Sequence, residues 1–221
     1  MVGKLQRITM PTLLTFGDSN THGTRPIVAE EDYPRLDAKT RWPCVTKEGL
    51  GDEWILIEEG LPGRTTCFDD PIMGSFMNGW MGLNIALSSH GPIDLLTIML
   101  GTNDCKALFG NSARDILGGI SGLLEISQNP DLQSRHGGYK TLLIAPPPIV
   151  VTGHLSASFY GADRLSEQLG DLYSEIAIHR GIEFFDAGKI IATSPVDGVH
   201  FDNEAHQALG VALAKKIKTI N

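Results

Sequence analysis

Ser19 could act as a nucleophile, because it lies where an apolar segment opens into a turn. The run Leu13–Phe16 predicts a short buried strand that Gly17 ends. Asp18 and Asn20 beside Ser19 favour turns and helix N-caps. A hydroxyl at this point would lie at the carboxyl edge of a sheet, where α/β folds bind ligands. The alternative is that Ser19 only caps the next helix, so the nucleophile hypothesis needs a base, an orienting group and oxyanion donors elsewhere in the chain.

Asp197 and His200 could supply the base and its orienting carboxylate. They are three residues apart in a glycine-containing turn that precedes the last predicted helix. Such spacing lets a carboxylate bind one imidazole nitrogen while the other nitrogen faces a serine hydroxyl. A solvent-exposed Asp and His in a turn is the alternative. His22 is the rival base, but no carboxylate stands at matching spacing, so His22 is better interpreted as a residue of the pocket wall.

Three groups could donate hydrogen bonds to a carbonyl oxygen that becomes negatively charged. They are the backbone N–H groups of Ser19 and Gly63 and the side-chain amide of Asn103, and each follows the end of a predicted strand. Acyl transfer needs donors aimed at such an oxygen. Asn103 could also be a simple turn residue. Several predicted strand ends each carry a residue type that ester hydrolysis requires. Together they are stronger evidence for this reaction than any single residue.

Apolar runs typical of strands alternate with helical patterns along the whole chain. The predicted strands are Leu13–Phe16, Trp54–Ile57, Asp94–Leu100, Lys140–Ala145 and Ile182–Phe185. Helices are predicted over 41–50, 78–89, 112–127, around 165–176, and from Asn203 onwards. This alternation predicts a doubly wound five-stranded parallel sheet with helices on both faces, in a single domain over 1–221. The loop from Pro148 to Gly161 is expected to form a wall or lid of a pocket.

The composition excludes several classes of protein. The chain has 221 residues, of which 42% are hydrophobic and 20% charged, as in ordinary globular domains. A net charge of -8 argues against binding to nucleic acid or to an anionic membrane. Cys44, Cys67 and Cys105 are odd in number and lack metal-type spacing, so we expect no disulfide framework and a reducing, cytoplasmic setting.

Four blocks of the sequence resemble, in order, those of the SGNH (GDSL-type) serine hydrolases. The blocks are Gly17–Ser19, Gly63, Gly101–Asp104 and Asp197–His200. Over nearly the whole chain the sequence is similar to the microbial arylesterase/acyltransferase branch. Further segments that carry this similarity are Arg41–Pro43, Glu58–Leu61, Gly63–Thr66, Met99–Asp104, Pro146–Pro148 and Phe184–Gly188.

The resemblance implies a role for each candidate residue. Ser19 would be the nucleophile, His200 the base and Asp197 the group that orients it, with Gly63 and Asn103 in the oxyanion hole. It also implies a flavodoxin-like sheet in the order 2-1-3-4-5, no metal and no cofactor. Homo-oligomers, with an octamer among the expected states, would narrow the mouth of the active site.

Two positions depart from the branch. Asn20 replaces the usual leucine after the serine, and His22 stands where tryptophan is frequent. Both are candidate substrate-binding residues, because both would make the alcohol or acyl pocket more polar. The resemblance therefore predicts esterase activity more directly than it predicts a preference for aryl esters.

The sequence thus predicts a serine carboxylesterase that hydrolyses short acetyl or aryl esters through an acyl-enzyme, with transfer of the acyl group to alcohols as a second expected reaction. The expected partner is a small-molecule ester. One alternative is a deacetylase of acetylated carbohydrates, and another is a non-catalytic small-ligand binder on the same fold. A dinucleotide site is disfavoured because no G-x-G-x-x-G follows the first strand.

Overall fold

The predicted strands pair into one parallel sheet. In the computed structural model, which describes residues 10–29 and 34–220, the strands are β1 (Thr12–Gly17), β2 (Ile55–Gly60), β3 (Leu95–Met99), β4 (Lys140–Ala145) and β5 (Glu183–Asp186). Their order is β2-β1-β3-β4-β5, and every neighbouring pair is parallel. This order and orientation confirm the predicted doubly wound fold.

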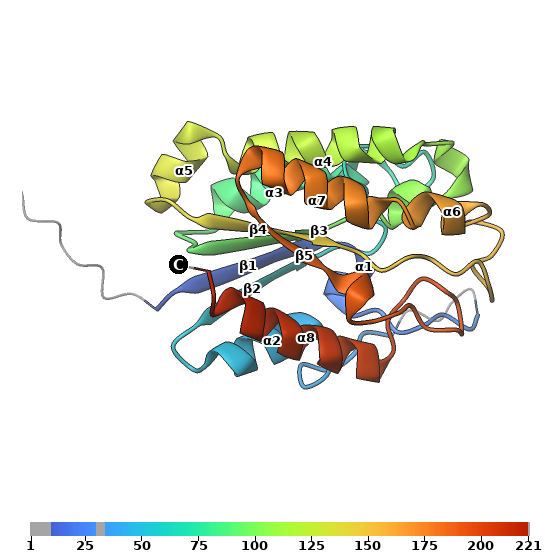
Figure 1. Cartoon of the computed structure of the whole chain (residues 1–221), viewed down its shortest axis with the longest axis horizontal. Coiled ribbons are helices and arrows are strands. Elements are labelled where there is room, and N and C mark those ends of the chain that lie inside the picture. Colours follow the sequence, from blue (N-terminus) through green and yellow to red (C-terminus); the bar gives the residue numbers. More distant parts are fainter. Residues whose placement is uncertain (1–9, 30–33, 221) are drawn as a thin grey trace, which may run out of the picture.

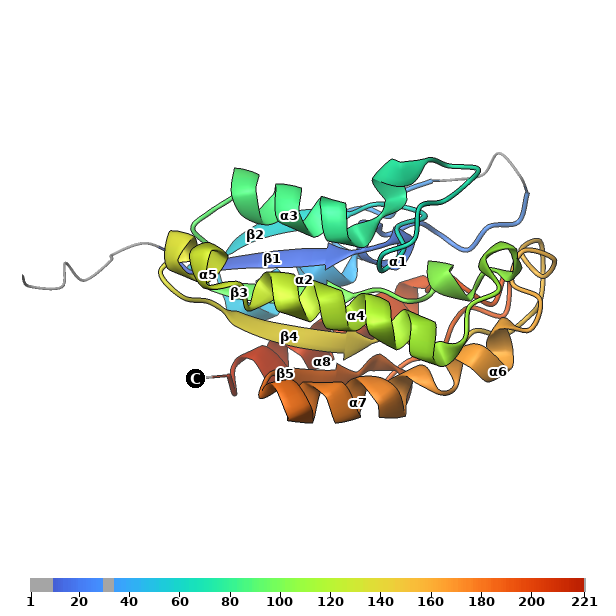
Figure 2. The ribbon, with the colours of Figure 1, turned by 90° about the horizontal axis from the view of Figure 1, so that it is seen from above.

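Helices cover both faces of the sheet (Figure 1). One face carries α3 (Gly79–Ser89), α4 (Ala113–Ser127), α5 (Pro130–His136) and α7 (Leu169–Arg180), and the other carries α2 (Trp42–Leu50) and α8 (Asn203–Ile217). Figure 2 shows α3, α4 and α7 side by side across the sheet. The short helices α1 (Ser19–His22) and α6 (Ala162–Ser166) lie at the carboxyl ends of the strands. Among the described helices, none has the length and apolar character that a membrane span requires.

The central strand β1 is buried on both sides because its neighbours and the two helical layers enclose it. Leu13 packs into the core beneath α2 and α8, whereas Leu14 and Phe16 pack into the core beneath the opposite layer. Successive side chains of a strand point to opposite faces, so a strand covered on both faces is largely apolar. This packing fixes the carboxyl end of β1, and hence the residues that follow it.

Helix α8 fixes the position of the turn that carries His200. Its N-cap Asp202 accepts a hydrogen bond from the Ala205 N–H at 2.8 Å, and the helix packs closely against α2, where Gly210 lies against Val45. An Asp at this position satisfies an amide that the helix itself leaves unpaired. The turn that carries His200 is therefore attached directly to a rigid element.

Apart from the four-residue α1, the helices differ from the predicted ones in two places. Helix α5 was not predicted, although its signal is present: Asn129 caps the Asp131 and Leu132 N–H groups, and Pro130 stands at the first helical position. The single helix predicted around 165–176 is two helices, α6 and α7. Near that break the Ser166 hydroxyl donates to the Asp163 carbonyl and accepts from the Ile149 N–H, so it binds backbone both inside and outside α6.

Candidate active site

Ser19, His200 and Asp197 form one line of hydrogen bonds. Ser19 Oγ lies 3.0 Å from His200 Nε2, and His200 Nδ1 lies 2.7 Å from Asp197 Oδ2. The three residues are 181 and 3 positions apart in the sequence, and all three are buried. In this arrangement the imidazole can take the hydroxyl proton while the carboxylate stabilises the resulting positive charge.

The Asp197 carboxylate is held in place by donors from two segments. Its Oδ1 accepts hydrogen bonds from the Val199 and His200 N–H groups, and its Oδ2 accepts from the Ile27 N–H at 2.6 Å as well as from the imidazole. Burial alone would raise the pKa of Asp197, but the hydrogen bonds and the charge of His200 outweigh burial, so this pKa lies below its ordinary value. Asp197 is therefore an anion suited to orienting His200.

The turn between Asp197 and His200 requires glycine at position 198. Gly198 has φ +71°, and a Cβ built on it would lie 1.6 Å from the Val150 carbonyl oxygen. The Gly198 carbonyl in turn accepts a hydrogen bond from the Val150 N–H at 2.9 Å. Only a residue without a side chain allows this close approach. The loop after β4 thus packs directly against the turn that carries His200.

Gly63 and Asn103 lie at the same opening as Ser19. All three line one cavity, and Gly63 has a positive φ of +91°. Within the described residues, the Gly63 N–H donates to no other group. One hydrogen of the Asn103 amide is donated to the Arg64 carbonyl at 3.1 Å, which fixes the orientation of the side chain. Its second hydrogen remains for a ligand.

Two buried charged residues hold these donors in position. The Asp104 carboxylate accepts hydrogen bonds from the Thr66 N–H, at 2.9 Å, and from the Thr66 hydroxyl, which ties the end of β3 to the segment after Gly63. The Arg64 guanidinium donates to the Gly17 carbonyl at 3.0 Å and lies 4.1 Å above the Phe16 ring. Both contacts bind the loop after β2 to its neighbours, so Asp104 and Arg64 support the site without lining the cavity.

The cavity has a volume of about 370 Å³, within the range of small-molecule sites. Its walls are largely apolar, and the loop predicted to form a wall contributes Leu155 and Phe159. His22 also lines it, as expected for a residue of the pocket wall. A second depression of about 310 Å³, which includes Tyr139, Lys140 and Glu183, lies near the amino-terminal ends of β4 and β5 and contains none of the predicted site residues.

Asn20 does not line the cavity, so the expectation that it contacts substrate is corrected. Its side chain is buried, with 1% exposure; its Nδ2 donates to the Val199 carbonyl at 3.1 Å and its Oδ1 accepts from the Phe201 N–H at 3.2 Å. The helical turn that begins at Ser19 rotates the next side chain away from the opening. Asn20 therefore binds the backbone on both sides of His200 and joins the serine segment to the histidine turn.

Lys106 and Met73 line the cavity and were missed in the sequence. Lys106 follows the Asn103 segment directly, so its position three residues beyond a predicted donor was an available signal. Its Nζ lies 3.5 Å from the buried Asp70 carboxylate. Met73 lies against Gly63, a contact between separate parts of a loop that no local pattern indicates. Within the described residues no cluster of His, Cys, Asp or Glu is suited to hold a metal, and the three cysteines are free thiols outside the cavity lining.

Asp18 is a buried carboxylate directly before the nucleophile candidate. Its Oδ1 accepts from the Asn20 N–H at 2.9 Å, whereas its Oδ2 has no hydrogen-bond partner among the described residues. Burial raises the pKa of Asp18 to about 6. The folded protein therefore binds a proton on the Asp18 carboxylate more tightly than the unfolded chain does. As a result, the free energy of unfolding falls as pH rises from about 4 to about 6 and stays reduced above that range.

Asp18→Asn is therefore expected to stabilise the protein above pH 6. At pH 8 its free energy of unfolding should gain up to about 3 kcal/mol relative to the original protein, because the amide cannot ionise. The gain should shrink as pH falls below about 6 and vanish below about pH 3, where Asp18 is protonated in both folded and unfolded chains. Urea unfolding of both proteins at several pH values measures the difference. A difference that does not change with pH would show that Asp18 is ionised without cost in the folded protein.

Comparison with known protein families assigns the chain to a family. Residues 15–208 match the model of the GDSL-like lipase/acylhydrolase family. The match spans most of the sequence, and the chain belongs to this family of ester hydrolases. A search of curated proteins found no match.

Solved structures agree with this assignment. The structure of a carbohydrate acetylesterase from Sinorhizobium meliloti is 36% identical, with a TM-score of 0.89, over 96% of this chain and 100% of that chain. The native aryl esterase of M. smegmatis is also 36% identical over the same shares of the two chains, with a TM-score of 0.90. The resemblance to SGNH hydrolases is thereby confirmed for both sequence and fold.

Proposed function

We propose that this protein is a serine carboxylesterase that hydrolyses short-chain acyl esters through an acyl-enzyme. Ser19 is the nucleophile, His200 the general base and acid, and Asp197 the residue that orients the imidazole. The backbone N–H groups of Ser19 and Gly63, together with Asn103 Nδ2, form the oxyanion hole. The proposal rests on one observation above all: the hydrogen-bonded line from Asp197 through His200 to Ser19 opens into a cavity beside these donors.

The reaction then follows from the positions of the groups. Ser19 Oγ forms a bond to the ester carbonyl carbon while its proton moves to His200 Nε2, and the carbonyl oxygen becomes negative between the donors. The carbon–oxygen bond to the alcohol breaks as His200 returns the proton to the leaving oxygen. Water next attacks the acyl-enzyme, giving its proton to His200 and releasing the acid and the Ser19 hydroxyl. Asp197 stays ionised throughout.

Acyl transfer to alcohols is a second reaction that the same site supports. The apolar side chains of Ile27, Leu155 and Phe159 line the cavity beside Ser19, and such walls favour an organic acceptor over water. Product analysis at increasing alcohol concentration tests this reaction. The proposal of transfer requires a new ester among the products, and free acid as the sole product at every alcohol concentration would refute it.

Hydrolysis of p-nitrophenyl acetate and p-nitrophenyl butyrate by the purified protein tests the esterase proposal directly. We expect turnover of both, with the shorter acyl group preferred because the cavity is small. A fluorophosphonate should label the protein once per chain, and peptide mass spectrometry should locate the label on Ser19. A protein that binds small ligands without catalysis would neither turn over these esters nor react with the fluorophosphonate.

Asn103→Ala is expected to lower kcat by about 100-fold to 1000-fold with a small change in KM, because the amide donor acts mainly on the negative oxygen of the transition state. Steady-state kinetics with p-nitrophenyl acetate measures both constants. Thermal unfolding of the same sample controls for the lost hydrogen bond to the Arg64 carbonyl. A change in KM with unchanged kcat would place Asn103 in ground-state binding instead.

A further inference from the structure

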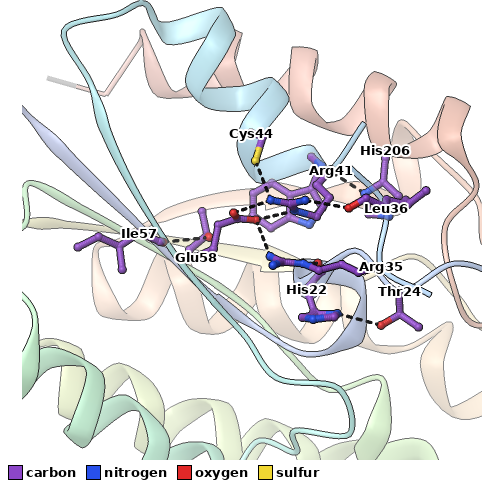
Figure 3. A network of polar contacts seen from close by, with 11 residues as sticks. His22, Thr24, Arg35, Leu36, Arg41, Cys44, Ile57, Glu58 and His206 are labelled. Atoms are coloured by element: carbon purple, nitrogen blue, oxygen red, sulfur yellow. Dashed lines mark hydrogen bonds and ion pairs between the residues drawn. The ribbon is translucent and has the colours of Figure 1, made fainter. Parts of the chain in front are cut away.

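His22 is fixed at the edge of the cavity by a network of charged residues. The Arg35 Nε donates to the His22 carbonyl at 2.8 Å, and the guanidinium groups of Arg35 and Arg41 both bind the Glu58 carboxylate, at 3.2 and 2.8 Å. Figure 3 shows these ion pairs beside the His22 ring, which is directed toward Thr24. The distance between His22 Nδ1 and Thr24 Oγ1 is 3.2 Å. The imidazole and the hydroxyl thus form a pair on a rigid support.

The place of this pair in the cavity indicates which part of an ester it would contact. Both residues line the cavity together with Ser19 and His200. Three residues beyond Thr24, the Ile27 N–H donates to Asp197 Oδ2, so the segment runs beside the turn that carries His200. Since His200 must protonate the leaving oxygen, we expect the alcohol portion of an ester to lie next to the segment of His22 and Thr24, with the carbonyl oxygen toward Gly63 and Asn103.

The His22 ring is kept neutral. Burial is the largest effect that lowers its pKa, and the positive charges of Arg35 and Arg41 lower it further, against a smaller opposite effect of Glu58. A neutral imidazole has one N–H donor and one acceptor nitrogen. Whichever nitrogen carries the proton, the bonded His22 and Thr24 together retain one free donor and one free acceptor. A hydroxyl group, which donates one hydrogen bond and accepts others, matches this pair.

We propose that His22 and Thr24 form a recognition site for a hydroxyl group on the alcohol portion of the ester, so that the preferred substrates are acyl esters of polyols or sugars. This inference rests on the proposed esterase function and specifies its substrate class. Apart from the catalytic and oxyanion residues, and from Lys106, which is engaged with Asp70, the remaining walls of the cavity are mainly apolar. This pair would therefore provide the polar selectivity on the leaving-group side.

Two acetate esters with the same three-carbon alcohol skeleton test the proposal: glycerol 1-monoacetate and propyl acetate. We expect the original protein to prefer the monoacetate in kcat/KM by about tenfold, the effect of a well-placed hydrogen bond. His22→Phe keeps a ring without nitrogen atoms, and Thr24→Val keeps the volume without the hydroxyl. Each should reduce the ratio of the two kcat/KM values by about fivefold to tenfold.

The ratio separates recognition from general damage, because misfolding or a displaced Ser19 slows both esters alike. Thr24→Ser retains the hydroxyl and should retain the ratio, and the double variant should lose little more than either single one, because the pair acts as a unit. If His22→Phe fails to fold, the comparison of Thr24→Val with Thr24→Ser decides; if Thr24→Val fails to fold, the ratio in His22→Phe decides. Equal rates for the two esters, or an unchanged ratio in the variants, would overturn the inference. Failure of the original protein to hydrolyse p-nitrophenyl acetate as well would instead reject the esterase function.

Discussion

Ser19→Ala is expected to reduce kcat/KM for p-nitrophenyl acetate by at least about 1000-fold, and by as much as about a millionfold. Without Oγ no acyl-enzyme can form, and the remaining activity must come from the oxyanion donors acting on direct attack by water. Labelling by a fluorophosphonate should disappear in parallel. The substitution removes one hydrogen bond to His200 and no packed side chain, so the midpoint of thermal unfolding should shift by only a few degrees.

Ser89→Ala is the matched control for this substitution. Ser89 is exposed at the end of α3, and its hydroxyl donates only to carbonyls of the same helix, those of Ile85 and Ala86. The kcat/KM of Ser89→Ala should remain within about twofold of the original value, as is usual for a surface substitution away from the site. Turnover in Ser19→Ala that equals the turnover of this control would remove the nucleophile from the proposed mechanism.

Asp197→Asn should lower kcat by about 10,000-fold, the effect known for a triad whose carboxylate becomes an amide. The amide oxygen can still accept the hydrogen bonds from the Val199 and His200 N–H groups. Its NH₂ group would then face two donors, the Ile27 N–H and the proton on His200 Nδ1. The imidazole relieves this conflict by moving its proton to Nε2, and in that tautomer it can no longer accept the proton of Ser19.

Asp202→Asn distinguishes this effect from the general loss of a nearby carboxylate. Asp202 caps α8 only two residues after His200, and asparagine caps helices about as well as aspartate. The kcat of Asp202→Asn should stay within about twofold of the original value.

Rapid quenching of the reaction between Asp197→Asn and p-nitrophenyl acetate should show slow acylation of Ser19. Acylation at the original rate would mean that Asp197 supports the turn without orienting the base.

Several features of the site had local signals in the sequence. The apolar run before Ser19 predicted its place at the end of a buried strand, and the spacing of Asp197 and His200 predicted their contact. Both signals are local, since a strand enclosed on both faces is largely apolar and a three-residue turn brings its ends together. The donor positions of Gly63 and Asn103 followed from the rule that parallel strands end at one edge of the sheet.

The orientation of side chains at this edge depended on contacts between distant segments. Asn20 was expected to contact substrate, but the helical turn after Ser19 directs it to the backbone around His200. Lys106 and Met73 line the cavity through loop packing, and the Ile27 N–H completes the set of donors to Asp197 from 170 residues away. No periodicity or spacing records such contacts.

The sequence by itself therefore determined which residue types stand at the strand ends, because alternation, apolar runs and turn residues act over a few positions. Only the tertiary structure decided which of those side chains face the cavity, which ones join the loops behind it, and that His22 pairs with Thr24 at its rim. The physical reason is that hydrogen bonds and close packing between loops depend on distances that exist only after the sheet has brought those loops to one edge.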